Sequence, residues 1–180
     1  MFGTSFRVRM QDAWQLRYLF KCFGLMSVVL VMDACELDNP AREPLPLDYE
    51  NFVCSVQPVV VNTCSFSVCH GNSKRNFRVL SPSGMRISDE YAIARERLSA
   101  DDLAAGIQPP LTETELRYNF DQASAFATMP PGESMLLLRP LPVEQGGRFH
   151  GQGGDIFPTR DNESYRAIED WMHGQTGGCE

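Results

Sequence analysis

The sequence predicts an all-α domain with long loops. Apolar residues recur at helical spacing in several segments, two capping boxes mark helix starts, and no segment alternates apolar and polar residues as a half-buried strand does. The chain has 180 residues and a formal net charge of −7. That length allows one small domain with a leader and a tail. The acidic balance argues against nucleic-acid binding, which relies on a basic surface.

The first helix is expected to begin at Asp48, because aspartate is a good N-cap. Apolar residues then recur at helical spacing from Tyr49 to Val60. Pro58 lies inside this pattern, and it should kink the helix or end its first part, since proline lacks the backbone N–H. Residues 72–84 contain many polar and turn-forming residues, so we expect a loop there.

Two further helical regions are marked by capping boxes. Residues 88–106 are predicted to form two short helices, with a capping box from Ser99 to Asp102 between them. A second capping box, Thr112 to Glu115, should open a longer helix that Pro130-Pro131-Gly132 stops. The apolar face of that helix is expected to contain Leu116, Phe120, Ala123, and Phe126 or Ala127.

The C-terminal part combines a glycine-rich loop with a last helix. The apolar run Met135–Leu138 is too short to assign, and residues 146–154 are rich in glycine. The last helix should start near Asp161 or Asn162 and end before Gly174. Its buried face is expected to consist of Tyr165, Ile168, Trp171 and Met172.

The N-terminal segment predicts export. Basic residues precede the apolar stretch Cys22–Met32, which falls short of the ~20 residues that span a bilayer and fits a signal peptide. The string MDAC at residues 32–35 resembles the lipobox of bacterial lipoproteins. We therefore expect a lipoprotein signal peptide over 1–35, lipidation of Cys35, and a tether over 36–47. The protein would then be anchored to the periplasmic side of the outer membrane or to the cell surface; a plain secretory signal and an uncleaved anchor are alternatives.

The segment Cys64 to His70 contains the candidate chemistry. Its sequence, CSFSVCH, resembles the attachment signature of c-type haem, in which two cysteines are followed directly by a histidine. In that signature the two thiols bond to the haem vinyl groups, and the histidine is forced under the iron as a ligand. Here four residues separate the cysteines, where two are usual. A longer loop can bulge outward and still span the two vinyl groups.

With its surroundings, this motif makes the chain resemble a c-type cytochrome-like domain of bacterial lipoproteins. The resemblance implies a cytochrome c-like helical domain over 48–180, with 81–128 as an insertion and with the first and last helices packed together. It implies haem c as the cofactor, electron transfer without substrate turnover, and redox proteins as partners. It is carried by Val56-Gln57-Pro58-Val59 in the first helix, Cys69-His70-Gly71, His150 in the glycine-rich segment, and Tyr165 and Trp171 in the last helix.

The resemblance implies His150 as the second axial ligand, because a histidine followed by glycines occupies this place in such domains. Glycines also let a backbone approach a flat macrocycle closely. Met129 and Met135 are the competing ligands, and His173 is expected to face solvent. Two arginines flank the region and are candidates to pair with haem propionates: Arg139 and Arg148.

The remaining cysteines leave alternatives open. Cys54 and Cys179 are expected to form a disulfide, because neither has a haem-compatible neighbour and exported cysteines are usually occupied. If Cys64 and Cys69 also formed a disulfide, the chain would be a haem-free, stapled surface module that binds another protein. A zinc site of Cys64, Cys69, His70 and one further ligand is another alternative. A haem peroxidase needs a free distal acid–base group, and none remains if two histidines bind the iron.

Overall fold

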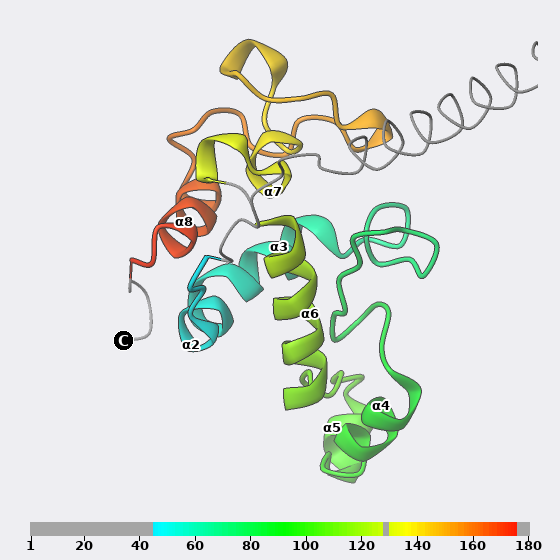
Figure 1. The fold of residues 1–180 in the computed structure, drawn as a ribbon. Helices are drawn as coiled ribbons and strands as arrows, with labels where there is room; N and C mark the ends of the chain where they lie inside the picture. The colour runs from blue at the N-terminus through cyan, green and yellow to red at the C-terminus, as the bar shows by residue number, and fades with distance from the viewer. Residues whose placement is uncertain (1–44, 128–129, 176–180) are drawn as a thin grey trace, which may run out of the picture. The chain divides into compact units, whose positions relative to one another are not determined.

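The computed structural model describes residues 45–127 and 130–175. These residues form helices and no β-strand, which confirms the all-α prediction (Figure 1). Within the described ranges, no helix has both the length and the apolar character needed to cross a bilayer. The predicted signal peptide, Cys35, most of the tether and Cys179 lie outside the described residues, so these predictions stay open.

The helices follow one another with loops of very different length between them. The longest loop covers residues 65–87 and begins within the Cys-His motif, Cys64 to His70. The elements in chain order are α2 (Tyr49–Asn51), the π-helix η1 (Phe52–Val56), α3 (Gln57–Cys64), α4 (Ser88–Arg95), α5 (Ala100–Ala104), α6 (Glu113–Phe126), the 3₁₀ turn η2 (Pro131–Glu133), α7 (Met135–Leu138), the 3₁₀ turns η3 (Val143–Gln145) and η4 (Gly151–Gly153), and α8 (Glu163–Met172).

The first helical segment begins where its N-cap predicts. The Asp48 side chain accepts a hydrogen bond of 2.6 Å from the backbone N–H of Asn51. Pro58 does not end the segment, because the π-helix η1 precedes it. A π-helical turn is wider than an α-helical one, and it gives the proline ring room beside the preceding turn. Helical structure therefore continues from Tyr49 to Cys64 without a break.

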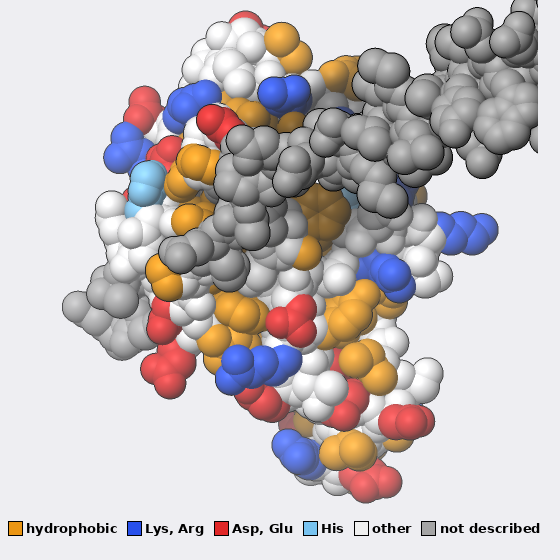
Figure 2. Space-filling view, viewed as in Figure 1, with side chains coloured by type: hydrophobic (Ala, Val, Ile, Leu, Met, Phe, Trp, Pro, Cys, Tyr) orange, Lys and Arg blue, Asp and Glu red, His pale blue; other side chains and the backbone are white. Residues whose placement is uncertain are grey.

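The helices α4 and α5 form the separate short pair that the sequence predicts, and both predicted capping boxes are present. Figure 1 shows this pair near the N-terminal end of α6. Exposed hydrophobic side chains lie among acidic ones on this pair (Figure 2): Ile93, Leu103 and, just after α5, Ile107. In the first turn of α6, Glu115 is fully buried and forms a 2.6 Å ion pair with Arg86.

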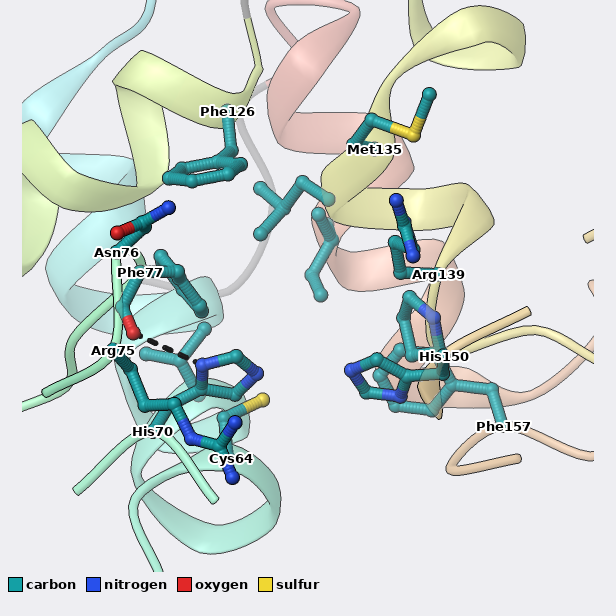
Figure 3. A pocket seen from close by; sticks show the side chains of 14 residues that line it. Cys64, His70, Arg75, Asn76, Phe77, Phe126, Met135, Arg139, His150 and Phe157 are labelled. Carbon is teal, nitrogen blue, oxygen red and sulfur yellow. Dashed lines mark hydrogen bonds between the residues drawn. The ribbon is translucent and has the colours of Figure 1, made fainter. Parts of the chain in front are cut away.

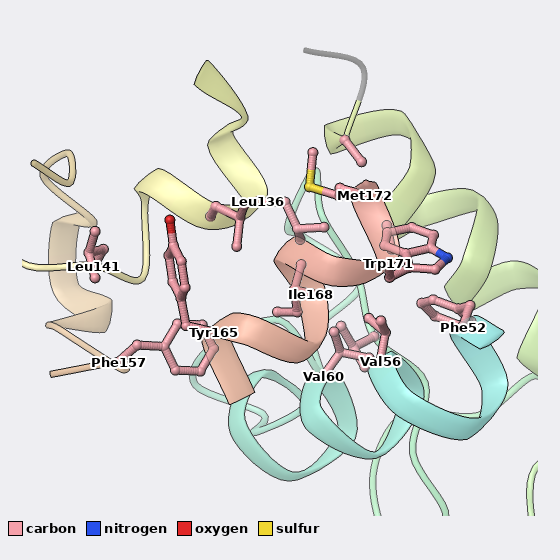
Figure 4. Packing of buried hydrophobic residues seen from close by; sticks show 14 residues of the cluster. Phe52, Val56, Val60, Leu136, Leu141, Phe157, Tyr165, Ile168, Trp171 and Met172 are labelled. Atoms are coloured by element: carbon pink, nitrogen blue, oxygen red, sulfur yellow. The ribbon is translucent and has the colours of Figure 1, made fainter. Parts of the chain in front are cut away.

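The core joins the first helical segment to the last helix, as the sequence predicts (Figure 4). The rings of Phe52 and Trp171 are 5.4 Å apart, and the Trp171 indole N–H donates a 2.8 Å hydrogen bond to the Asp48 carbonyl. Asn162 caps α8, and the predicted face of that helix is buried. The cluster comprises Phe52, Val56, Val60, Val79, Ala123, Ala127, Leu136, Leu137, Leu141, Phe157, Tyr165, Ile168, Trp171 and Met172.

A buried amide on α6 fixes the loop that follows the Cys-His motif. Asn119 is 2% exposed, and its side chain both accepts from the N–H of Leu80 and donates to the Leu80 carbonyl, each at 2.8 Å. The same amide donates to the Gln57 side chain at 3.3 Å. One residue therefore ties α3, the loop and α6 together, which places the loop against the helical core.

Candidate functional site

The structure brings His70 and His150 together, although 80 positions separate them in the sequence. Their ring centres are 5.9 Å apart, and their ring planes differ by 19°. Figure 3 shows the two imidazoles on opposite sides of a cavity, directed toward one another. Both side chains are partly buried.

Each histidine uses the same ring nitrogen to bond to the protein. The Nδ1 of His70 lies 3.0 Å from the Phe77 carbonyl, and the Nδ1 of His150 lies 3.0 Å from the Gly154 carbonyl. A carbonyl only accepts hydrogen bonds, so Nδ1 is the protonated nitrogen in both rings. In the neutral form of such a ring the Nε2 keeps a lone pair, and the backbone contact fixes the ring orientation, as it does in metal-ligating histidines.

The loop from Cys64 to Gly71 positions His70. Its own backbone bonds close it: the His70 N–H donates to the Cys64 carbonyl at 3.0 Å, and the N–H groups of Cys69 and Gly71 both donate to the Phe66 carbonyl. A Cβ atom on Gly71 would lie 1.9 Å from the Ser65 carbonyl oxygen. Only glycine fits at this position, immediately after the candidate ligand.

The extra length of the motif loop bulges outward, as expected. Phe66 and Val68 are 59% and 78% exposed. Cys64 and Cys69 are partly buried free thiols, and both contribute to the wall of one cavity beside His70. The two sulfurs are therefore not joined to one another, and they lie on the same side of the site as His70.

Glycines position His150 as well. A Cβ atom on Gly153 would lie 2.9 Å from the His150 ring. Gly151 and Gly154 have φ angles of 66° and 67°, a region that favours glycine. In the structure Gly151 and Gly154 shape the turn, and Gly153 leaves space for the histidine's own ring; the expected approach of a macrocycle stays a prediction.

Two adjoining cavities, of about 270 and 190 Å³, flank the histidine pair. Both are bounded by Cys64, His70, Arg75 and His150. The larger cavity is mostly apolar and runs between α3 and α6 on one side and α7 on the other (Figure 3). Its other lining residues are Val60, Asn76, Phe77, Phe126, Met135, Leu136, Arg139, Pro140, Phe157 and Ile168.

Burial sets the protonation of two site residues. It raises the pKa of the Cys64 thiol, an effect that the Thr63 hydroxyl opposes and the neighbouring Cys69 reinforces. It lowers the pKa of His70, an effect that the Phe77 carbonyl opposes, while His150 and Arg75 reinforce it. Near neutral pH the thiol therefore keeps its hydrogen and the imidazole is neutral, which is the form that can bind a metal.

The other predicted ligands and partners differ in their placement. Met135 lines the larger cavity, whereas Met129 lies outside the described residues. His173 is exposed and caps the end of α8, as expected. Arg139 lines the cavity and donates a 2.7 Å hydrogen bond to the Phe149 carbonyl, but Arg148 is exposed and lines neither cavity.

Cys54 is disulfide-bonded. Its predicted partner, Cys179, lies outside the described residues, so the pairing stays a prediction. One observation bears on it: the side chain of Asn51, one turn before Cys54, donates a hydrogen bond to the carbonyl of Gln175, the last described residue. The C-terminal end of the described chain therefore meets the helix that contains Cys54.

Sequence reasoning missed two contributors to the site, Arg75 and the Phe77 carbonyl. Neither has a sequence signal, because Arg75 stands in a polar loop like any surface residue and a carbonyl belongs to every residue. Among the described residues, no three histidine, cysteine or acidic side chains are grouped so that they could hold a metal ion, so Cys64, Cys69 and His70 do not form a zinc-type cluster.

The chain was compared with protein-family models, curated proteins and solved structures, and none of them matches it.

Proposed function

We propose that this protein is a monohaem electron carrier of the c type. Cys64 and Cys69 would bind the haem covalently, and His70 and His150 would be its two axial ligands. The observation that carries the proposal is the facing pair of histidines, because two remote segments present the same free nitrogen across one cavity.

The spacing of the rings is close to the spacing that one metal ion between them requires. A metal–nitrogen bond of about 2.0–2.1 Å on each side, with about 1.15 Å from each nitrogen to its ring centre, gives ring centres about 6.4 Å apart when the metal lies on the line between the two nitrogens. The observed separation of 5.9 Å is about 0.5 Å shorter than that.

The surroundings suit a flat apolar cofactor better than a hydrated metal ion. Aromatic and aliphatic side chains line the larger cavity, among them Phe77, Phe126 and Ile168. The free thiols lie at the smaller cavity, as attachment requires. A bound haem would supply one-electron exchange between Fe(III) and Fe(II).

The chain's own residues have three roles in this proposal. His70 and His150 would both bind the haem iron and leave no position for a substrate, which is the reason to propose a carrier and not an enzyme. The apolar lining of the larger cavity would lower the polarity around the cofactor, which influences its potential. Arg139 lies at the cavity and is a candidate to pair with a propionate. Export, lipidation at Cys35, an outer-membrane or cell-surface location and redox protein partners complete the proposal.

The test is to produce the full chain in a bacterial host with a cytochrome c maturation system and to record its mass and spectrum. We expect a mass increase of one haem and a low-spin spectrum. His150→Ala should convert the spectrum to one that lacks the sixth protein ligand. His173→Ala is the matched control, because His173 is exposed on α8, and it should leave the spectrum unchanged.

Two results would contradict the proposal at different points. A low-spin spectrum that is unchanged in His150→Ala excludes His150 as a ligand. Met129 and Met135 are then the remaining candidates for the sixth ligand. A colourless chain whose mass lacks haem excludes the electron carrier, and the haem-free surface module that binds another protein becomes the explanation.

A further inference from the structure

We infer that Arg75 is a positioning residue that holds the enlarged Cys64–Cys69 loop in the shape in which both thiols reach one haem. The inference rests on the proposed function. Arg75 lies five positions after His70, outside the attachment motif. It lines both cavities, yet its guanidinium bonds to the motif loop.

The guanidinium spans two consecutive carbonyls of the loop. Its Nε donates to the Cys69 carbonyl at 3.2 Å, and its Nη2 donates to the Val68 carbonyl at 3.1 Å. The planar fork of arginine makes this two-point contact possible, and a lysine ammonium has no equivalent geometry. Cys69 is thus held from outside the loop at the residue that presents the second thiol.

The loop needs such support because it is two residues longer than the usual motif. Its internal bonds use the N–H groups of Cys69 and His70, and those bonds do not engage the carbonyls of Val68 and Cys69. Val68 itself projects into solvent. A longer loop has more conformations to lose when its ends are fixed. Contacts from outside the loop offset part of that cost.

The same turn makes a second contact that also holds the motif loop. The Arg75 N–H donates to the Asn72 carbonyl at 3.1 Å, which closes a turn. The Asn72 side chain then donates to the Ser67 carbonyl at 3.2 Å. Three consecutive loop carbonyls, from Ser67 to Cys69, are therefore bonded by side chains of the turn that follows the motif.

The chemistry explains why the position of Cys69 matters. In each attachment a cysteine Sγ forms a bond to the vinyl carbon next to the ring, the thiol hydrogen goes to the outer vinyl carbon, and the vinyl π bond is consumed. No oxidant and no leaving group take part. Once Cys64 has reacted, Cys69 can react only if the loop places its thiol at the second vinyl group.

The experiment compares Arg75→Gln and Arg75→Lys with the control Lys74→Gln in the full chain matured with haem. Lys74 is exposed and its side chain does not bond to the loop. The first readout is the state of Cys69, measured by alkylation under denaturing conditions followed by peptide mass mapping, together with the pyridine haemochrome band, which reports unreacted vinyl groups. The second is hydrogen exchange in peptides that cover residues 64–71.

We expect both Arg75 variants to contain chains attached through Cys64 alone, with an alkylated Cys69 and a haemochrome band shifted toward one free vinyl group. Exchange over 64–71 should be about ten-fold faster, the factor that corresponds to about 1.4 kcal/mol of lost hydrogen bonding. Arg75→Lys separates fork geometry from charge, since it keeps the charge. Lys74→Gln should match the wild-type chain in both readouts.

Each other outcome has a distinct meaning. Two complete attachments in both Arg75 variants would overturn the inference while the proposed function stands, whatever the exchange rates. Unchanged exchange with one lost attachment would also overturn it, because Arg75 would then not act through the loop. A wild-type chain without covalent haem removes the proposed function itself, and this inference with it.

Discussion

Substituting Gly71 by alanine should distort the backbone of the motif loop and displace His70. The added Cβ would lie 1.9 Å from the Ser65 carbonyl oxygen and 2.8 Å from the Ser65 carbonyl carbon, and real Cβ contacts essentially never fall below 3.0 Å. The backbone must therefore move by about 1 Å, the difference between 3.0 and 1.9 Å. A movement of that size at Gly71 also displaces His70, its direct neighbour.

The cost follows from what that movement breaks. The N–H groups of Cys69 and Gly71 both bond to the Phe66 carbonyl, at 2.8 and 3.0 Å, and a 1 Å shift stretches them beyond hydrogen-bond distance. Overpacking costs about 1–3 kcal/mol and each of the two lost hydrogen bonds about 0.5–1.5 kcal/mol, so the free energy of unfolding should fall by about 2–6 kcal/mol.

The assay is urea unfolding of the full chain as isolated, followed by far-UV circular dichroism. Gly132→Ala is the matched control, because a Cβ there meets nothing within 4 Å and its φ is not positive. That variant should be neutral or gain up to about 1 kcal/mol. If Gly71→Ala unfolds at the same urea concentration as Gly132→Ala, the close approach to Ser65 has no energetic role and the reasoning is refuted.

Three further predictions concern the rest of the domain. Gly153→Ala should displace the His150 ring, which lies 2.9 Å from the added Cβ, and change the low-spin spectrum of the haem-loaded chain without lowering the urea midpoint. An unchanged spectrum would show that the ring tolerates the contact. Glu115→Gln should lower the free energy of unfolding by about 3–5 kcal/mol, because Arg86 stays buried without its anionic partner; a loss below about 1 kcal/mol would contradict this. Burial raises the pKa of Glu115, but hydrogen bonds from Arg86, Thr112 and Ile87 outweigh it and leave the pKa below its ordinary value. Its contribution is therefore present above the unfolded pKa of about 4.3 and is lost as the pH falls through the lower folded pKa, so wild-type stability should fall more steeply with acid than that of Glu115→Gln.

Local signals were enough to place most of the helices, but not the short α7, whose run Met135–Leu138 is too short to assign from the sequence. Asp48, Ser99, Thr112 and Asn162 each cap the helix start that the sequence assigned to that place, because a cap depends only on the next three residues. Pro58 is the exception, since the same local signal gives no indication that a π-helical turn would accommodate it.

Buried polar residues could not be predicted, because their burial depends on distant partners. Glu115 and Asn119 are polar residues that the expected apolar face of α6 does not include, yet both are buried. Arg86 satisfies the first, and the backbone of Leu80 satisfies the second. Their partners come from 29 and 39 positions away, a separation that helical periodicity does not encode.

The candidate site could be located from the sequence where its residues form a contiguous motif. Cys64, Cys69 and His70 form one motif, and His150 stands out because glycines surround it. That the two histidines face each other follows only from the fold. The arginines show the limit of this reasoning: Arg139 lines the cavity, Arg148 next to His150 does not, and Arg75 had no signal at all.

The amide of Asn119 has a consequence for shortening this chain. The resemblance marks 81–128 as an insertion, but the last helix of this stretch, α6, is hydrogen-bonded through Asn119 to Leu80 and Gln57, which belong to the motif loop's continuation and to α3. A truncation that removed the whole stretch would remove Asn119 and with it the hydrogen bonds that hold the loop after the motif against α3. The removable part is the outer hairpin of α4 and α5, provided that the cut spares Arg86 and the start of α6.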